Sequence, residues 1–290
     1  MSNNTHLSST EAITFNDPNF EAALREILNK PDGAITKAEV EGLTELKIAN
    51  KDISSLAEIG YFTNLKVLDC RGNQLTSLDV SGNLALEVLK CSGCQLTALD
   101  VSANLALEWL ECGFCLITAI DVSHNAALKN LHCNFNQLTA LDISNNPALE
   151  VLRCEGNQLT ELDVSRNLAL ESLTCDRNQL AVLDVSGNPL LKVLQCQDNL
   201  LTALDISNNP ALELLHCWNN QLTALDVCNN AALKNLSCPG NQLTSLDIGK
   251  NPALERLVCY GNRLTALDVS GNPNLKHLYC EGSQQIETIQ

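Results

Sequence analysis

The stretch LKVLDCRGNQLTSLDVSGNLA, residues 65–85, recurs with the same spacing through most of the 290-residue chain. Its leucine and cysteine positions return every 21 residues until the sequence ends. The cysteines that mark this period are Cys70, Cys91, Cys112, Cys133, Cys154, Cys175, Cys196, Cys217, Cys238, Cys259 and Cys280. A fixed period of this length is typical of a solenoid, in which each coil buries its apolar residues only against neighbouring coils.

Each repeat divides into a short strand and a return path. Leu65, Leu68 and Cys70 bring apolar groups to one side of the strand, because alternate side chains of a strand point to opposite faces. Leu75 and Val80 lie on the return path and are expected to point into the same core. Burial at about 1.5–3 kcal/mol per side chain offsets the cost of ordering a coil only when the coils stack.

Three polar positions also recur with this period. Asn73 is expected to turn the chain and to bond backbone groups of its own coil and of the neighbouring coil. Asp79 and Asn83 begin two further columns, and we expect both side chains to fold back onto nearby backbone amides. An EF-hand calcium loop is not indicated, since Lys90 stands where that loop needs glutamate. The net charge of −16 is therefore partly a property of the scaffold.

The segment CSGCQLTALDVSANLALEWLECGFC, residues 91–115, has the cysteine spacing of a four-cysteine zinc site. The repeat explains this spacing differently, because Cys91 and Cys112 are ladder positions and Cys94 and Cys115 replace the repeated asparagine. We favour two buried thiols, with zinc and a Cys94–Cys115 disulfide as the alternatives. The ladder thiols are expected to stay reduced, because parallel inward side chains are poorly oriented for bonding.

The residues before the cysteine repeats follow another pattern. Helical spacing of apolar residues runs from Phe20 to Leu28, and Thr36 with Glu39 predicts a capping box that opens a second helix. The predicted organisation is a flexible N-terminus over 1–10, a helical cap over 11–42, a 22-residue leucine-rich repeat over 43–64, and eleven cysteine repeats over 65–290, the last incomplete.

The pattern L-x-x-L-x-C-x-x-N-x-L, with the cap and the 22-residue repeat, resembles the bacterial internalin family, most closely its internalin J-like members with cysteine-ladder repeats. The resemblance implies a leucine-rich-repeat solenoid, an α/β-type right-handed horseshoe with a helical N-terminal cap. Its parallel sheet would line the concave face, and turns, 3-10 or extended segments would form the convex face. Ser283, Ile286 and Ile289 depart from the pattern, which indicates either a modest C-terminal closure or the cut edge of a longer chain.

Composition and the resemblance together bound the location and the partners. A net charge of −16 opposes binding to nucleic acid and to anionic membrane. No apolar run approaches the roughly 18 residues of a membrane helix, so direct membrane insertion is not expected. The resemblance implies a secreted or bacterial cell-surface location for the full-length protein, with a cytoplasmic location as the alternative because the first thirty residues lack a secretory signal. We expect a monomer without cofactor or metal.

Aromatic residues beyond the first repeat occupy strand positions that face away from the core. Rigid surfaces that carry aromatic anchors are typical of interfaces. Three of the five histidines share these positions. The predicted partner-binding residues are Trp109, Phe114, His132, Phe135, His216, Trp218, Tyr260, His277 and Tyr279. They form two groups, on coils three and four and on coils eight to eleven, and scattered surface rings that shield one another are the alternative.

These patterns predict a non-catalytic module that binds a macromolecule through its concave face. An internalin-like adhesin with a protein partner comes first, by the resemblance. A glycan-binding surface protein is the alternative, because rings flanked by Asp, Asn and Gln also suit sugar stacking, and an intracellular scaffold or effector comes third. No nucleophile elbow, phosphate loop or metalloprotease motif occurs. His132 near Glu111 is expected to form an ion pair or a partner contact rather than an acid–base pair.

Overall fold

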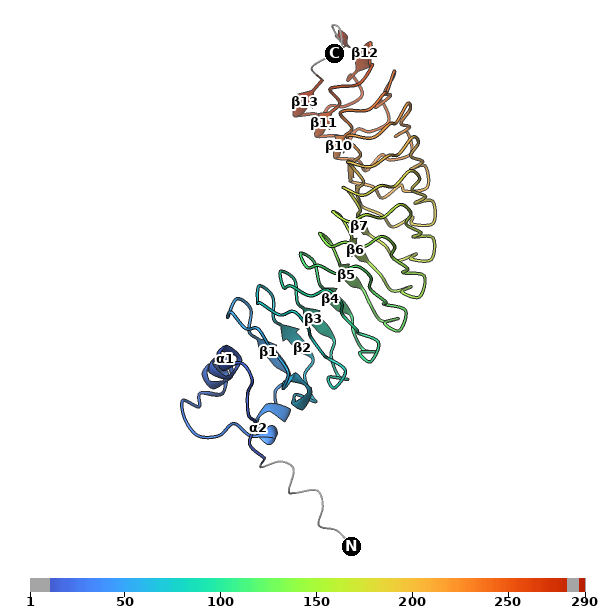
Figure 1. Cartoon of the computed structure of the whole chain (residues 1–290). Coiled ribbons are helices and arrows are strands. Elements are labelled where there is room, and N and C mark those ends of the chain that lie inside the picture. The colour runs from blue at the N-terminus through green and yellow to red at the C-terminus, as the bar shows by residue number, and fades with distance from the viewer. Residues whose placement is uncertain (1–10, 281–286, 290) are drawn as a thin grey trace. The chain divides into compact units, whose positions relative to one another are not determined.

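The computed structural model describes residues 11–280 and 287–289, and the chain divides into two compact units. The first unit extends to Leu138 and the second begins at Thr139. Each unit is a stack of coils with one short parallel strand per coil (Figure 1). The expected flexible segment 1–10 and the irregular positions Ser283 and Ile286 lie outside the described residues.

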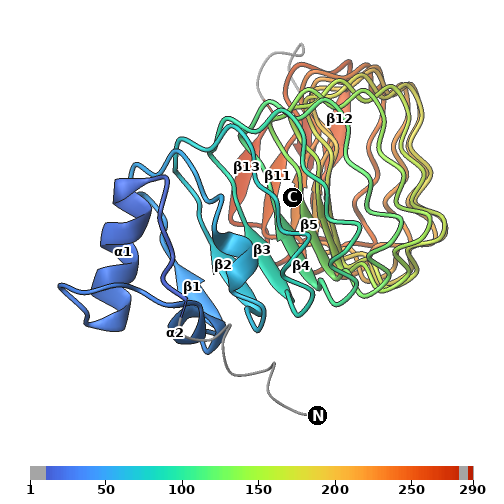
Figure 2. The ribbon, with the colours of Figure 1, turned by 60° about the horizontal axis from the view of Figure 1, so that its bottom comes forward.

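The first unit begins with helices and continues into strands that each pair with the next in parallel. Figure 2 shows the helices at the β1 end of this stack. In chain order the elements are α1 (Pro18–Leu28), α2 (Lys37–Glu41), β1 (Glu45–Lys47), the 3-10 helix η1 (Ile59–Tyr61), β2 (Val67–Asp69), β3 (Val88–Lys90), β4 (Trp109–Glu111) and β5 (Asn130–His132). No helix in the described part of the chain has the length and hydropathy needed to cross a membrane.

The two predicted N-terminal helices are present, and polar groups close their first turns. The carboxylate of Asp17 accepts hydrogen bonds from the N–H groups of Asn19 and Phe20, at 2.8 and 3.0 Å, which caps α1. The predicted capping box of α2 is confirmed, because the Glu39 carboxylate accepts from the backbone N–H and the hydroxyl of Thr36 at 2.8 and 2.9 Å.

Asp17 also ties α1 to the first repeat. Its second carboxylate oxygen accepts from the N–H and hydroxyl of Ser54 at 2.7 and 2.6 Å. The ring of Phe20 stacks on that of Phe62, with centroids 6.0 Å apart. Both rings are fully buried, so the cap covers the open end of the first coil with apolar surface.

The second unit repeats the same strand at intervals of 21 residues. Leu236 of one strand, for example, is in register with Leu257 of the next. The strands of the main sheet are β6 (Val151–Arg153), β7 (Ser172–Thr174), β8 (Val193–Gln195), β9 (Leu214–His216), β10 (Asn235–Ser237), β11 (Arg256–Val258) and β13 (His277–Tyr279). On the return path, β12 (Ala266–Asp268) pairs in parallel with β14 (Glu287–Ile289).

The predicted core positions are buried. Leu68, Cys70, Leu75 and Val80 have no solvent exposure, and the equivalent positions of later coils are buried in the same way up to Cys259. Turns, rather than helices, make up the return path of the cysteine repeats. Parallel strands with leucine and cysteine inside confirm the predicted leucine-rich-repeat solenoid.

Two of the three polar columns behave as predicted. Asn73 donates to the carbonyls of Ile48 and Cys70 and accepts from the N–H of Ile53, so it bonds two coils at once. In all ten repeats that carry it, the column aspartate accepts from the backbone N–H two residues later, as Asp79 does from Ser81 at 2.9 Å.

The third column corrects a prediction. Asn83 does not fold back onto a local amide, because its side-chain N–H group donates to the carbonyls of Ile59 and Phe62 in the preceding coil, each at 2.9 Å. Asn104 repeats this arrangement with Val80 and Asn83. The column is fully buried, so its amide protons find partners only in the next coil.

The expectation of a fully reduced ladder is wrong at its last position. Cys259 and Cys280 form a disulfide, with Cα atoms 5.1 Å apart. Stacked coils place ladder cysteines at about the strand spacing, which falls inside the Cα range that disulfides require, so parallel side chains do not exclude bonding. Cys94 and Cys115 are both buried free cysteines, and their thiols lie 3.6 Å from backbone carbonyls of Cys70 and Cys91.

Candidate binding surface

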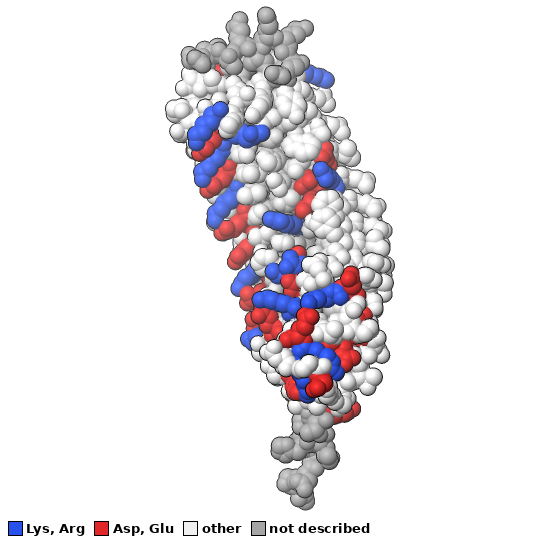
Figure 3. Space-filling model, turned by 90° about the vertical axis from the view of Figure 1, so that its left-hand side faces the viewer, with Lys and Arg blue, Asp and Glu red and all other residues white. Residues whose placement is uncertain are grey.

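The outward side chains of the strands form a surface that we call the strand face. It consists of the first and third residue of each strand and the two residues that follow each ladder cysteine. Within a strand the middle leucine is buried, whereas most first and third residues keep part of their surface exposed. In Figure 3, lysine, arginine and acidic side chains alternate in rows along the molecule, with uncharged surface beside them.

In the first unit, Trp109 is packed between charged and aromatic neighbours. The Lys90 ammonium lies 5.0 Å from the Trp109 ring centroid, and the His132 ring meets the indole edge-on at 5.4 Å. Trp109 is only half-buried, but its indole N–H is enclosed and lacks a hydrogen-bond partner among the described residues. The structure thus brings together the predicted residues Trp109 and His132 and adds Lys90.

Phe114 and Phe135 form a second ring pair in the same unit. Their rings stack with centroids 4.7 Å apart and an interplanar angle of 19°. Both residues have a left-handed backbone, with φ of 53° and 50°, at a position that is glycine in several other coils, such as Gly72 and Gly93. A left-handed phenylalanine is disfavoured by about 1–2 kcal/mol, so a folding advantage does not account for these rings.

In the second unit, four predicted residues line one open cavity of about 450–550 Å³, the printed value being 540 Å³. These are His216, Trp218, Tyr260 and Tyr279. Trp218 is half-buried, and the two tyrosines each expose 48% of their surface. The remaining lining residues are Asn219, Asn235, Ser237, Pro239, Gly240, Arg256, Val258 and Gly261. His277, the ninth predicted residue, is exposed on β13 and does not line this cavity.

The cavity contains one guanidinium and no carboxylate. The Arg256 guanidinium lies over the Tyr279 ring, 5.1 Å from its centroid. His216 is within 3.3 Å of the Gln195 side-chain amide. Burial lowers the pKa of His216, and the positive charge of Arg256 lowers it further, against an opposing hydrogen bond with Asn235. The imidazole is therefore neutral at pH 7, and Arg256 is the cation of the cavity.

Sequence reasoning did not select Arg256, Pro239 or Asn235 as site residues. Their positions are among the outward strand slots, but they are not aromatic and carry no motif. The available signal was position alone, since each lies in a coil that also presents one of the predicted rings or lies next to one. The partner-binding role of all these residues remains a proposal.

Acidic groups gather on the strand face of the second unit before this cavity. Burial raises the pKa of Glu155 and of Asp176, which occupy the same position in successive coils, and their mutual charge raises both further. Arg177 lies 3.9 Å from Asp176 and 3.8 Å from Asp198, so it partly neutralises this stretch. The acidic stretch and the cavity around Arg256 therefore offer opposite charge to a partner.

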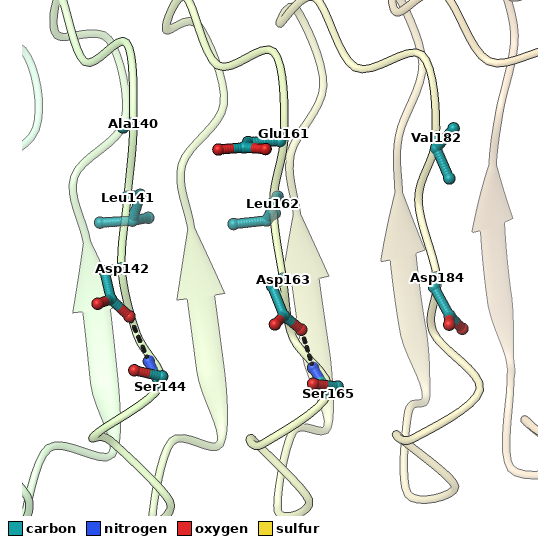
Figure 4. Close-up of a pocket in the computed structure, with 10 residues that line it drawn as sticks. All are labelled: Ala140, Leu141, Asp142, Ser144, Glu161, Leu162, Asp163, Ser165, Val182 and Asp184. Carbon is teal, nitrogen blue, oxygen red and sulfur yellow. Dashed lines mark hydrogen bonds between the residues drawn. The ribbon is translucent and has the colours of Figure 1, made fainter.

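Another hollow, of about 450 Å³, lies on the return path and is formed by the repeated turns (Figure 4). In Figure 4, Asp142 and Asp163 accept hydrogen bonds from the N–H groups of Ser144 and Ser165, at 2.9 and 2.8 Å. The same turn recurs in the other coils of the cysteine repeats, so these carboxylates are explained by the scaffold. In contrast, the cavity around Arg256 is formed by residues that differ from coil to coil.

Catalytic and metal chemistry find little support in the side chains. Within residues 11–280 and 287–289, no three His, Cys, Asp or Glu side chains are grouped closely enough to hold a metal ion. Burial raises the pKa of Cys196 and Cys238 to about 12, so these thiols are poor nucleophiles. Binding is the chemistry that the strand face can perform, through apolar contact, hydrogen bonds and one unpaired guanidinium.

Solved structures with the same fold include bacterial leucine-rich-repeat proteins. The functional domain of InlJ from Listeria monocytogenes, which includes a cysteine ladder, is 34% identical over 98% of this chain, with a TM-score of 0.95. This chain spans 64% of the length of that InlJ chain. The internalin InlF from the same species is 22% identical, with a TM-score of 0.75, over 93% of this chain and 96% of InlF. A leucine-rich-repeat protein from Leptospira interrogans is 24% identical, with a TM-score of 0.79, over 90% of this chain and 69% of that protein.

The last two similarities, each under 25% identity, show the fold alone. A scan against protein-family models gave no match, and a search of curated proteins gave none either. The resemblance that the repeats predicted is confirmed by the structural comparison, because the cysteine ladder and nearly the whole chain superimpose on the InlJ domain. The chain is thus a leucine-rich-repeat solenoid similar to the cysteine-ladder domain of InlJ and, in fold, to other internalins.

Proposed function

We propose that this chain is a non-catalytic protein-binding module that engages its partner through the strand face. The observation that carries the proposal is the cavity around Arg256, where Trp218, Tyr260 and Tyr279 come together from separate coils. Aromatic and arginine side chains in a partly enclosed site are the residue types that contribute most to protein interfaces. In a solenoid these outward rings are not needed for the core, which leucine and cysteine fill.

The similarity to InlJ supports a bacterial surface protein of the adhesin type, secreted or held at the cell surface in the full-length protein. A leucine-rich-repeat structure of the same fold, the plant peptide hormone receptor RGFR1, is known in complex with RGF2, which agrees with protein binding by such scaffolds. The stacked rings of Phe114 and Phe135 support a second contact on the strand face of the first unit, because they occupy a backbone conformation that favours glycine.

The test compares variants of the strand face with a matched variant elsewhere. The chain is immobilised and exposed to surface-labelled proteins of mammalian epithelial cells, and captured proteins are quantified by mass spectrometry and then measured individually by biolayer interferometry. Trp218→Ala with Tyr260→Ala should weaken the affinity for the partner at least about a hundredfold, since each anchor is worth about 1.4 kcal/mol or more. Phe114→Gly tests the first unit and should preserve folding, because glycine suits the left-handed backbone.

The control is Leu168→Ala with Leu190→Ala, which removes apolar side chains that are 61% and 50% exposed outside the strand face. This control should bind like the parent chain. Circular dichroism and urea unfolding establish that all variants are folded. Equal loss in control and strand-face variants, or no loss in either, would contradict the use of the strand face.

A glycan is the second candidate, because the same cavity places the amides of Asn219 and Asn235 beside the rings. Ring stacking with flanking amides is suited to sugars as well as to protein side chains. A glycan array distinguishes the two. Binding to an immobilised glycan that Trp218→Ala abolishes would replace the protein partner with a carbohydrate.

A further inference from the structure

We propose that the cavity around Arg256 accepts a carboxylate side chain of the protein partner, with an apolar side chain next to it in the partner resting on Trp218 and Tyr260. This inference rests on the proposed function and adds the chemistry of the segment that is recognised. It is carried by the contrast between this cavity and the remainder of the strand face.

The first observation is that Arg256 has no ionic partner in the described part of the chain. Arg256 is absent from the ion pairs there, and its only recorded contact of this kind is with the Tyr279 ring. Other basic residues are neutralised by their neighbours. Lysines on successive coils bond glutamates 21 residues away at 2.7–2.8 Å, as Lys234 does with Glu213 and Lys276 with Glu255. Arg71 bonds Asp69 at 2.8 Å.

The second observation is the composition of the cavity. None of its twelve lining residues is Asp or Glu, although the chain has 34 acidic residues and a net charge of −16. Screening confines the influence of more distant carboxylates, because the Debye length is about 8 Å at physiological salt. The local field at the mouth of the cavity is therefore set mainly by Arg256, and it favours an anion.

The third observation is that Arg256 is held in place. It is the first residue of β11, in register with Asn235 on one neighbouring strand and His277 on the other. The Tyr279 ring supports its guanidinium at 5.1 Å. A guanidinium with a fixed plane can donate two parallel hydrogen bonds to one carboxylate, which gives a stronger and more directional contact than an ammonium group.

The apolar half of the cavity follows from the repeat. Trp218, Pro239 and Tyr260 occupy the same position, directly after the ladder cysteine, in three successive coils. Strand spacing places them at intervals of about 4.8 Å, so they form a short apolar strip beside Arg256. A partner segment that pairs an acidic residue with a neighbouring aromatic or aliphatic residue matches both halves, whereas a basic segment would meet Arg256 unfavourably.

The test selects peptides against the folded chain. A phage library of random twelve-residue peptides is panned on the parent chain, on Arg256→Glu, on Trp218→Ala with Tyr260→Ala, and on Arg153→Glu. Arg153 is an exposed cation of the strand face on β6 that does not line the cavity, so its reversal controls for the change in total charge. The parent chain should enrich peptides in which Asp or Glu neighbours an apolar residue.

The selected peptides are then synthesised and measured by isothermal titration calorimetry. Arg256→Glu should weaken their binding about tenfold or more and should enrich Lys or Arg in its own selection, whereas Arg153→Glu should change affinity by less than about threefold. Binding of the acidic peptides should also weaken as salt is raised.

The remaining outcomes separate this inference from the proposed function. Enriched peptides that depend on Trp218 and Tyr260 but show no acidic preference, or that bind Arg256→Glu equally well, would overturn the carboxylate assignment and leave the binding surface standing. Failure to enrich any peptide whose binding depends on Trp218 or Tyr260 would count against both. Binding to an acidic glycan that Arg256→Glu abolishes would transfer the carboxylate from a protein to a sugar.

Discussion

At the scale of the residue, single polar side chains decide how neighbouring coils are joined. The repeated asparagine illustrates this, because Asn178 accepts from the N–H of Leu159 and donates to the carbonyls of Cys154 and Cys175. Cys94 and Cys115 stand in the same position and offer only a thiol. The sulfur of Cys94 lies beside the N–H groups of Asn73 and Leu75, which elsewhere would face an amide oxygen.

Restoring asparagine at this position should stabilise the chain. Cys94→Asn is expected to raise the free energy of unfolding by about 1 kcal/mol, because it replaces a weak sulfur contact with hydrogen bonds to buried backbone groups. Urea unfolding followed by circular dichroism measures the change. Asn178→Cys is the matched reverse variant and should lower the stability by a similar amount. A destabilised Cys94→Asn chain would show that the thiol fits this position better than an amide.

Asp17 should make the attachment of the helical cap sensitive to acid. Burial would raise its pKa, but hydrogen bonds from Ser54, Phe20 and Asn19 outweigh burial and lower the pKa to about 2. An aspartate in an unfolded chain titrates near about pH 3.9, so the folded state gains stability from this carboxylate above that pH. That contribution is lost as the pH falls through about 2.

The measurement is thermal unfolding between pH 7 and pH 2. Asp17→Ala should cost about 2 kcal/mol at pH 7, since it removes an N-cap and the bonds to Ser54. Asp17→Asn should remove the part of the acid sensitivity that this carboxylate supplies. Parallel pH curves for Asp17→Asn and the parent chain would contradict this role.

At the scale of the element, the ladder of cysteines behaves as a column of small apolar side chains inside the strands. Desolvation by burial raises the pKa of the ladder thiols, for example that of Cys196 to about 12, so they should be inert in the folded chain. The last position differs, because Cys259 and Cys280 are joined. Of the free cysteines, Cys228 alone is not buried, and its hydrogen bond with Asp226 raises its pKa as well.

Thiol titration should therefore distinguish folded, unfolded and reduced protein. Folded chain should react slowly with a thiol reagent at pH 8. Unfolded chain without reductant should expose twelve thiols, since the chain has fourteen cysteines and one disulfide uses two. Unfolded and reduced chain should expose fourteen. A count of fourteen before reduction would show that the last two ladder positions are not joined in solution.

At the scale of the whole molecule, the repeat accumulates negative charge along its return path. Each column aspartate is held by a serine, glycine or cysteine N–H in its own turn, and its nearest equivalents lie on adjacent coils. For Asp100, hydrogen bonds with Ser102 lower the pKa while the charges of Asp121 and Asp79 oppose that shift. With a net charge of −16, repulsion between coils opposes stacking.

Salt should consequently stabilise the chain. Raising NaCl from about 0.02 M to about 0.5 M shortens the Debye length below the distance between columns, and we expect a gain of about 1 kcal/mol in the free energy of unfolding. The urea midpoint at each salt concentration measures this gain. Asp100→Asn with Asp121→Asn keeps the turns, because asparagine forms them too, and should reduce the salt dependence. A midpoint that falls with salt would mean that the Lys–Glu pairs outweigh the acidic columns.

The sequence by itself determined the period, the core and the outward positions of this protein. Strand alternation assigns Leu68 and Cys70 to the inside and Trp109 or Tyr260 to the outside, and stacking makes residues 21 apart into neighbours. These are local and periodic properties, so they can be deduced without coordinates. Asn73 and the aspartate turns belong to the same class.

Only the tertiary structure decided what those outward side chains do together. It assigned Arg256 and Pro239 to the cavity with Trp218, excluded His277 from that lining, and joined Cys259 to Cys280. It also revealed the left-handed backbone beneath Phe114 and Phe135. The physical reason is that a repeat specifies which coils are adjacent, whereas rotamers, ring contacts and the local backbone depend on how residues from several coils pack in three dimensions.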